Sequence, residues 1–184
     1  MFYIEKISLL NFKNYQDFST NFDSGVNCIV GKNGIGKTNL LDAIYFLAFT
    51  KSAFNSIDNQ LINTNSNHFY VNGFFKNGDT KDFISSGLEK GKKKEFLKNK
   101  KPIGKLSEFV GAYPIVLITP YDTDLIRETS DARRKFFDGL ISQMNSEYLD
   151  VLLKYKVLIK NRNALLKHNL KHGRLDDALL QVLT

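Results

Sequence analysis

Eight residues near the N-terminus have the types and the spacing that hold a chain of phosphates. Residues 31–38 read GKNGIGKT, which matches the pattern G-x-x-x-x-G-K-[ST] at every fixed position. Glycines allow a tight turn whose backbone N–H groups point inward, and the start of a following helix adds partial positive charge. In this pattern the lysine reaches the β- and γ-phosphates and the hydroxyl is a ligand of Mg²⁺. The predicted nucleoside triphosphate site consists of Gly31, Lys32, Asn33, Gly34, Ile35, Gly36, Lys37 and Thr38, with Thr38 as the metal ligand.

The segments on either side of this loop have the patterns that a phosphate loop requires. The apolar run 26–30 (VNCIV) predicts a strand before it, and Cys28, the single cysteine of the chain, is expected to be a small buried side chain there. An amphipathic helix is predicted from Lys37 to about Phe49. A strand, a turn and a helix in this order favour a phosphate loop over a glycine-rich turn that carries a lysine by chance.

The rest of the chain is predicted to form strands first and helices afterwards. Alternating or continuous apolar patterns predict further strands at 2–10, 17–22, 68–76, 81–88, 92–103 and 114–118. The last of these, PIVLI, is typical of a strand buried on both faces. Helical patterns follow at 131–143, 146–170 and 174–183. We therefore predict an α/β fold with a phosphate-loop nucleotide-binding lobe and its β meander at 1–125, followed by a helical second domain that begins at 126–184.

The charge of the chain is concentrated in one segment. The net charge is +7, and residues 76–105 contain ten lysines against four acidic residues, which is six of those seven charges. Such a patch favours a polyanionic partner, and a solvated lysine-rich hairpin is the alternative interpretation. The single cysteine fits a reducing compartment, and no apolar run reaches membrane-spanning length, so a cytoplasmic location is expected.

Catalysis at a phosphate loop needs an acidic residue as well, and the sequence offers no convincing one. This residue usually follows a strand of four apolar residues, where it holds the metal and a water. Asp122 follows the apolar run 114–118 only after three intervening residues. The stretch SSGLEKG at 85–91 has the wrong order for a serine-glycine signature and lies in the predicted meander. We predict that the chain binds a nucleotide without hydrolysing it.

Several stretches together resemble the RecF family of bacterial recombination-repair proteins. They are LLNFKNYQDFS near the start, GKNGIGKTNLLDAIYFLAFTKS around the loop, and the long block from FVGAYPIVLITPYDTDLIRETSDARRKFFDGL to RNALLK. The resemblance covers essentially the whole chain. Tyr121, Thr50 and Asn55 depart from the residues usual in the family, which weakens a metal role for the turn at 120–122 and a basic contact after the first helix.

The resemblance carries its own expectations. It implies a fold like the heads of SMC- and ABC-type ATPases, binding of ATP with Mg²⁺, dimerisation on ATP, and binding to DNA at gaps, where RecR and RecO cooperate in loading RecA. It implies roles in DNA replication, repair and recombination and in the SOS response. It also implies a C-terminal half that this chain lacks. Lys13 and Asn14 fall in a turn that lies against the nucleotide in related heads, and a solvated turn is the alternative.

These observations lead to one interpretation with two alternatives. The chain is interpreted as the ATP-binding N-terminal part of a RecF-like repair ATPase. The lysines expected to contact DNA are Lys92, Lys93, Lys94, Lys98, Lys100 and Lys101. A small phosphate-loop kinase and a non-catalytic interaction module with a vestigial loop are the alternatives.

Overall fold

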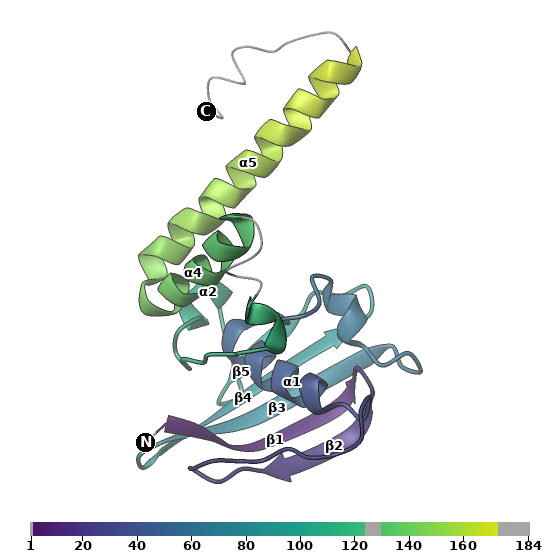
Figure 1. Cartoon of the computed structure of the whole chain (residues 1–184), viewed down its shortest axis with the longest axis vertical. Coiled ribbons are helices and arrows are strands. Elements are labelled where there is room, and N and C mark those ends of the chain that lie inside the picture. The colour runs from purple at the N-terminus through teal and green to yellow at the C-terminus, as the bar shows by residue number, and fades with distance from the viewer. Residues whose placement is uncertain (1, 124–129, 173–184) are drawn as a thin grey trace. The chain divides into compact units, whose positions relative to one another are not determined.

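The computed structural model describes residues 2–123 and 130–172 (Figure 1). The chain divides into two units, Met1–Ile118 and Thr119–Thr184. The first unit holds the sheet and the phosphate loop, and the second holds the long helices. The predicted boundary at residue 125 lies close to this division, and the predicted helix at 174–183 lies outside the described residues.

The first unit is built on one antiparallel sheet of six strands in the order β2-β1-β3-β4-β5-β6. The strands are β1 (Phe2–Phe12), β2 (Tyr15–Asn21), β3 (His68–Asn77), β4 (Thr80–Glu89), β5 (Glu95–Lys98) and β6 (Lys101–Pro102). Hairpin turns join most of these neighbours, as the predicted meander requires, and Figure 1 shows the strands side by side. The turn between β5 and β6 is formed by Asn99 and Lys100, which both have positive φ, of 50° and 67°.

Helix α1 (Lys37–Phe49) lies on one face of this sheet (Figure 1). Its buried side chains meet alternate residues of the strands, so that Phe46 packs against Phe12 and Phe69 with ring centroids 6.1 and 5.6 Å apart. Each large side chain buried in this way contributes about 2 kcal/mol to folding. The helix ends at Phe49, as the sequence predicted. Two short helices complete the unit, η1 (Asp58–Leu61) and α2 (Leu106–Phe109).

Two strand predictions are wrong. Residues 26–30 and 114–118 form no strand, and Val26, Val30, Val116 and Ile118 are largely exposed. Cys28 is also exposed, which corrects the expectation that it is buried. Neither segment pairs with a strand among the described residues. A strand buried on both faces needs neighbours on both sides, so an apolar pattern alone does not produce one.

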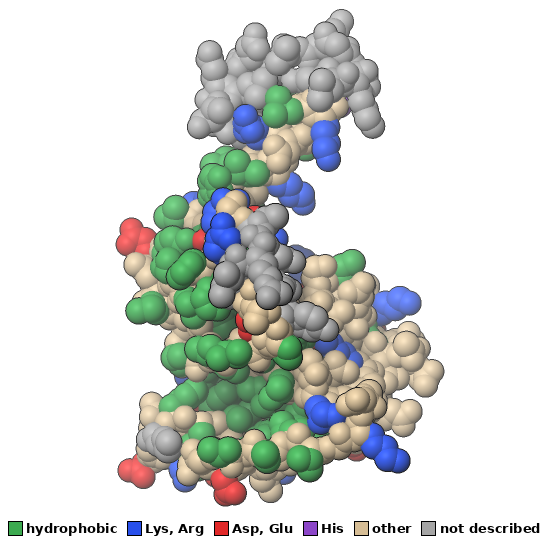
Figure 2. All heavy atoms as spheres, in the orientation of Figure 1, with side chains coloured by type: hydrophobic (Ala, Val, Ile, Leu, Met, Phe, Trp, Pro, Cys, Tyr) green, Lys and Arg blue, Asp and Glu red, His purple; other side chains and the backbone are tan. Residues whose placement is uncertain are grey.

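The second unit contains the short helix η2 (Pro120–Thr123) and an antiparallel pair formed by α4 (Ser130–Met144) and α5 (Ser146–His172). The Tyr148 hydroxyl donates to the Asp138 carboxylate at 2.6 Å, which joins the two helices near their connection. Figure 2 shows hydrophobic side chains on the surface of this unit; the exposed ones include Phe137, Met144, Val151, Leu153, Tyr155, Val157 and Leu158. Within the described part of the chain, no helix is both long and apolar enough to cross a membrane.

Candidate nucleotide site

The loop at 31–38 leads directly into α1, as a phosphate loop must. Gly36 has φ 115° and precedes the first helical residue, Lys37. Gly34 has φ 80°, and both values lie in the region that glycine adopts without strain. The helix therefore begins at the residue where its N–H groups and its dipole can act on an anion held by the loop.

The Lys37 side chain folds back across the loop. Its Nζ atom donates to the carbonyl oxygens of Gly31 at 2.8 Å and of Lys32 at 3.0 Å. These two oxygens hold the ammonium beside the loop backbone, where it can exchange carbonyl contacts for phosphate oxygens. The next residue, Thr38, is exposed, so its hydroxyl is accessible to a ligand.

Asn14 of the β1–β2 turn and Tyr15, the first residue of β2, hold the loop from outside. The Asn14 amide donates to the carbonyl of Ile35 at 2.8 Å and accepts from the amide of Asn39 at 2.8 Å. The Tyr15 hydroxyl donates to the carbonyl of Gly36 at 3.1 Å, and burial raises the pKa of this phenol, which keeps it a donor. A Cβ atom at Gly36 would lie 2.7 Å from the Asn14 side chain. Asn14 and Tyr15 therefore fix the position of the loop.

Lys13 is engaged with a buried carboxylate. Its Nζ atom lies 2.6 Å from the carboxylate of Asp42, and the two side chains are 11% and 0% exposed. Asp42 lies on α1, one turn after Thr38. The expected contact between Lys13 and the nucleotide remains a prediction, since in this structure the ammonium contributes to an internal ion pair.

Asp42 also holds the segment that follows α1. Its carboxylate accepts from the Ser52 hydroxyl at 2.7 Å and from the Ala53 backbone N–H at 2.7 Å. The Ser52 oxygen in turn accepts from the backbone of Phe54 and Asn55. One buried carboxylate thus connects the β1–β2 turn, α1 and residues 52–55.

The sequence analysis named Lys13 and Asn14 but missed three other residues of this network, Tyr15, Asn39 and Asp42. Asp42 carried a usable signal, because it is the one acidic residue in the otherwise apolar run 40–49, where a buried charge needs a partner. Tyr15 and Asn39 carried none, since their contacts join segments more than 20 residues apart.

The donor set near the loop fits a magnesium ion bound mainly through the nucleotide. Among the described residues, no group of three or more His, Cys, Asp or Glu side chains could hold a metal. Mg²⁺ usually keeps several waters and takes one or two protein ligands together with phosphate oxygens. The accessible hydroxyl of Thr38 suits that arrangement, and its role as a ligand remains a prediction.

The six lysines that were expected to contact DNA differ in their exposure and in their ion pairs. Lys94 is only 15% exposed, lies 2.9 Å from the Asp58 carboxylate, and donates to the carbonyl of Thr50 at 2.6 Å. Its charge is used inside the fold, so we leave Lys94 out of the proposed DNA surface. Lys92 and Lys98 are paired near the surface, with Glu89 and Asp82 respectively.

The other three lysines are freely accessible. Lys93, Lys100 and Lys101 are exposed, and none of them forms an ion pair with a described residue. Lys100 stands at the tip of the β5–β6 hairpin with φ 67°, where glycine would be less strained. These three charges are the part of the patch best suited to contact phosphates.

Asp122 stabilises its own turn. Its carboxylate accepts from the backbone N–H of Thr119 at 2.5 Å, and its own N–H donates to the Thr119 carbonyl. These contacts explain the residue as part of η2. They offer no support for a role in orienting a water or a metal.

Comparison with known proteins gives the family. A sequence model described as an AAA ATPase domain matches residues 2–170. The RecF proteins of Cytophaga hutchinsonii and Flavobacterium johnsoniae, named for DNA replication and repair, are 49% and 43% identical to this chain over 97% and 98% of its length. These matches cover 47% and 50% of the two relatives, so the chain spans about half of their length.

Solved structures agree with the sequence relatives. A structure of the recombination mediator RecF with ATPrS, from the RecFOR pathway, is 32% identical and superposes with a TM-score of 0.90 over 99% of this chain and 49% of that one. An SMC ATPase structure is 27% identical, with a TM-score of 0.60 over 75% of this chain and 99% of that one. The predicted α/β phosphate-loop fold of the SMC-head type is thereby confirmed. The chain belongs to the AAA ATPase domain family, and the relatives that it matches over nearly its whole length are RecF proteins.

Proposed function

We propose that this chain binds ATP with Mg²⁺ and forms the nucleotide-binding, N-terminal part of a RecF-type DNA repair ATPase. The observation that carries the proposal is the geometry of Lys37, whose ammonium is held across the glycine loop by two carbonyl oxygens at 2.8 and 3.0 Å. A solved RecF structure with ATP superposes on this chain with a TM-score of 0.87 and supports the choice of nucleotide.

The parts of the loop have separate roles in binding. The backbone N–H groups and the start of α1 surround the phosphates, and Lys37 contributes a charge-assisted contact. Thr38 contributes its hydroxyl to the metal, which supplies further positive charge beside the phosphates. Asn14 and Tyr15 keep the loop in its binding shape before the nucleotide arrives, which lowers the ordering cost of binding.

DNA binding is proposed for the surface formed by Lys93, Lys100 and Lys101, with Lys92 and Lys98 at its edge. Lysines that neutralise phosphates give sequence-independent, salt-dependent binding. The names of the relatives, which place RecF proteins in DNA replication and repair and in the RecFOR pathway, support a role in DNA repair with RecR and RecO as partners. Binding at DNA gaps, loading of RecA, a cytoplasmic location and an ATP-dependent homodimer are proposed on the resemblance to the family alone.

We further propose that the chain alone does not turn ATP over. Hydrolysis needs a carboxylate that orients water beside the γ-phosphate, and the contacts of Asp122 are used within its own turn. Contacts that are equally strong in the ground and transition states give affinity without rate. A phosphate-release assay tests this point, and steady release that disappears in Lys37→Ala would contradict it.

A thermal unfolding experiment with nucleotide tests the proposed binding. ATP with Mg²⁺ at a hundredfold excess over its dissociation constant should stabilise the folded chain by about 2.7 kcal/mol. Glycerol-3-phosphate at the same concentration is the control, because a single phosphate makes fewer contacts with the loop than a triphosphate and should stabilise the chain much less. An unchanged melting temperature at millimolar ATP would contradict the proposal.

A further inference from the structure

Two sets of side-chain donors hold the carbonyl oxygens of the phosphate loop. The Lys37 ammonium holds the first two carbonyls of the loop, at 2.8 and 3.0 Å. Asn14 and Tyr15 hold the carbonyls of Ile35 and Gly36, at 2.8 and 3.1 Å. In the proposed function Lys37 turns to a phosphate, so its two carbonyl contacts are given up while the nucleotide is bound. The shape of the occupied loop then depends on Asn14 and Tyr15.

The contact made by Asn14 depends on the orientation of its side-chain amide. This amide has a donor end and an acceptor end, and only its NH₂ group can bind the Ile35 carbonyl. The opposite end, the Oδ1 atom, accepts a hydrogen bond from the Nδ2 atom of Asn39 at 2.8 Å. A half-turn of the amide would bring two oxygens together at Ile35 and two NH₂ groups together at Asn39. Asn39 therefore favours the orientation in which Asn14 holds the loop.

Asn39 belongs to the helix that the loop leads into, so its position is tied to that of the loop. It is the third residue of α1, directly after Thr38. Its amide meets Asn14, which lies 25 positions earlier in the chain. The Asn14 amide is packed against the loop backbone, because a Cβ atom at Gly36 would lie 2.7 Å from its nitrogen and 2.8 Å from its oxygen. With so close a fit, a reversed Asn14 amide would act directly on the loop.

We propose that Asn39 is a positioning residue for the nucleotide site, which acts through Asn14 and does not touch the nucleotide itself. The inference rests on the proposed ATP binding and adds a residue to it. The donor group of Asn39 sets the direction of the Asn14 amide, and Asn14 holds the Ile35 carbonyl just before α1 begins. A carbonyl held in this way leaves the neighbouring backbone N–H groups to the phosphates. Because the loop is already in shape, less ordering is required when ATP binds.

The inference makes aspartate a more damaging substitution than alanine at position 39. Asn39→Ala removes the donor but lets Asn14 keep its contact with the Ile35 carbonyl. Asn39→Asp offers only acceptors. A hydrogen bond to a charged oxygen is about twice as strong as a neutral one, so the Asn14 NH₂ group should turn to the new carboxylate and release Ile35. An acidic side chain in the first turn of a helix is otherwise favourable, so α1 itself should not be weakened.

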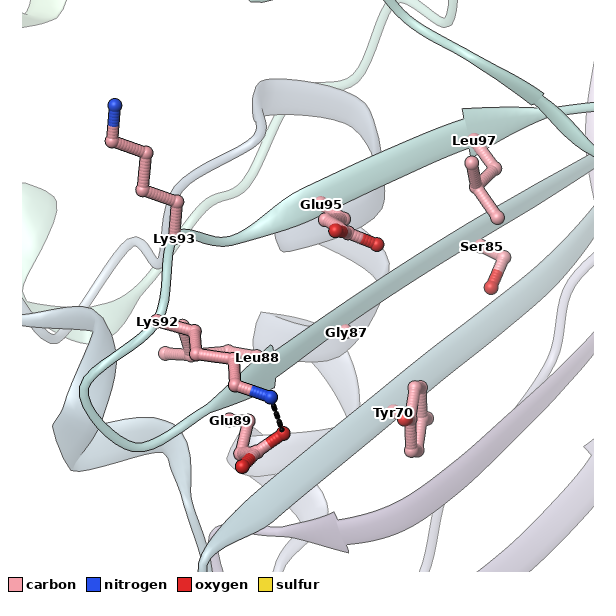
Figure 3. Close-up of a pocket in the computed structure, with 9 residues that line it drawn as sticks. All are labelled: Tyr70, Ser85, Gly87, Leu88, Glu89, Lys92, Lys93, Glu95 and Leu97. Carbon is pink, nitrogen blue, oxygen red and sulfur yellow. Dashed lines mark hydrogen bonds and ion pairs between the residues drawn. The ribbon is translucent and has the colours of Figure 1, made fainter.

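Isothermal titration of ATP with Mg²⁺ into the full chain measures the effect. Asn39→Ala should weaken binding about twofold and Asn39→Asp about twentyfold, of which roughly tenfold acts through Asn14 and the rest is repulsion of the phosphates. A double-mutant cycle separates the two parts, because in the Asn14→Ala background Asn39→Asp should weaken binding only about twofold. Glu89→Gln is the control for net charge: it changes one charge of the exposed pair with Lys92 (Figure 3) and should leave the affinity for ATP unchanged.

Thermal unfolding without nucleotide distinguishes positioning from a merely structural role. Asn39→Asp should unfold at the wild-type temperature, and a clearly lower temperature would overturn the inference. Equal losses of affinity from Asn39→Asp with and without Asn14 would overturn it too, as would an affinity of Asn39→Asp equal to that of Asn39→Ala. These results would leave the proposed ATP binding intact. Failure of the wild-type chain to bind ATP would instead refute the proposed function, and the role of Asn39 with it.

Discussion

Replacing Asp42 with alanine should destabilise the first unit more than any single surface change. The carboxylate is fully buried and has three partners, the Lys13 ammonium at 2.6 Å and the Ser52 hydroxyl and Ala53 N–H at 2.7 Å. Asp42→Ala removes the acceptor and leaves a nearly buried ammonium without its counter-charge. Removing one member of a buried pair in this way costs 3–5 kcal/mol, so we expect a loss of about 4 kcal/mol.

Two further variants separate charge from shape. Asp42→Asn keeps an oxygen that can accept from the Ala53 N–H, so it should cost about half as much as alanine. Lys13→Met leaves the carboxylate with its two neutral donors and should also be destabilising. When Lys13→Met is combined with Asp42→Asn, the total loss should be clearly smaller than the sum of the two, because the same ion pair is removed in both.

Native-state hydrogen exchange measures this loss in the right part of the chain. Amides of β1 and β3 report the unfolding of the sheet unit separately from α4 and α5. A loss of about 4 kcal/mol corresponds to a roughly thousandfold drop in their protection. Glu89→Gln, which breaks an exposed pair with Lys92, is the control and should change protection by less than about twofold. Protection within tenfold of wild type in Asp42→Ala would refute the role given to this carboxylate.

Two other predictions concern the loop and the lysine patch. Gly36→Ala should abolish measurable ATP binding in calorimetry, because its φ of 115° is strained for alanine and the new Cβ would lie 2.7 Å from the Asn14 side chain. Gly25→Ala is the control, since a Cβ atom there would have nothing within 4 Å, and it should bind ATP normally. Wild-type affinity in Gly36→Ala would contradict the loop geometry. Lys94→Met should lower the free energy of unfolding by about 2 kcal/mol and leave the salt dependence of DNA binding unchanged, because the Lys94 charge pairs with Asp58. If the DNA affinity of Lys94→Met depends less steeply on salt than that of wild type, Lys94 belongs to the DNA surface.

The parts of the fold that could be predicted are those coded by short-range patterns. The loop at 31–38, α1 and the meander follow from the spacing of glycines, apolar residues and turn residues within about fifteen positions. The runs at 26–30 and 114–118 were predicted wrongly for a physical reason. An apolar run shows that a segment is suited to a buried position between strands. Among the described residues, no strand pairs with 26–30 or with 114–118.

The sequence predicts which loop residues would bind the nucleotide, but it does not predict most of the contacts that hold the loop in place. The roles proposed for Lys37 and Thr38 follow from the motif alone. The pairing of Lys13 with Asp42 joins residues 29 positions apart, and the contacts of Tyr15 and Asn39 depend on how the β1–β2 turn meets α1. Local patterns cannot specify such contacts, because they are fixed by the packing of the helix on the sheet.

Isothermal titration of ATP with Mg²⁺ into the chain and into Lys37→Ala tests the central claim most directly. Lys37→Ala removes the ammonium that lies across the loop but keeps the backbone N–H groups, so the loss of a charge-assisted contact should weaken binding by about 2 kcal/mol, or roughly thirtyfold. Lys93→Ala is the matched control, because it removes an exposed lysine outside the loop, and its affinity for ATP should match wild type. Equal affinities of wild type and Lys37→Ala, or no binding by the wild-type chain, would contradict the assignment of residues 31–38 as a nucleotide site.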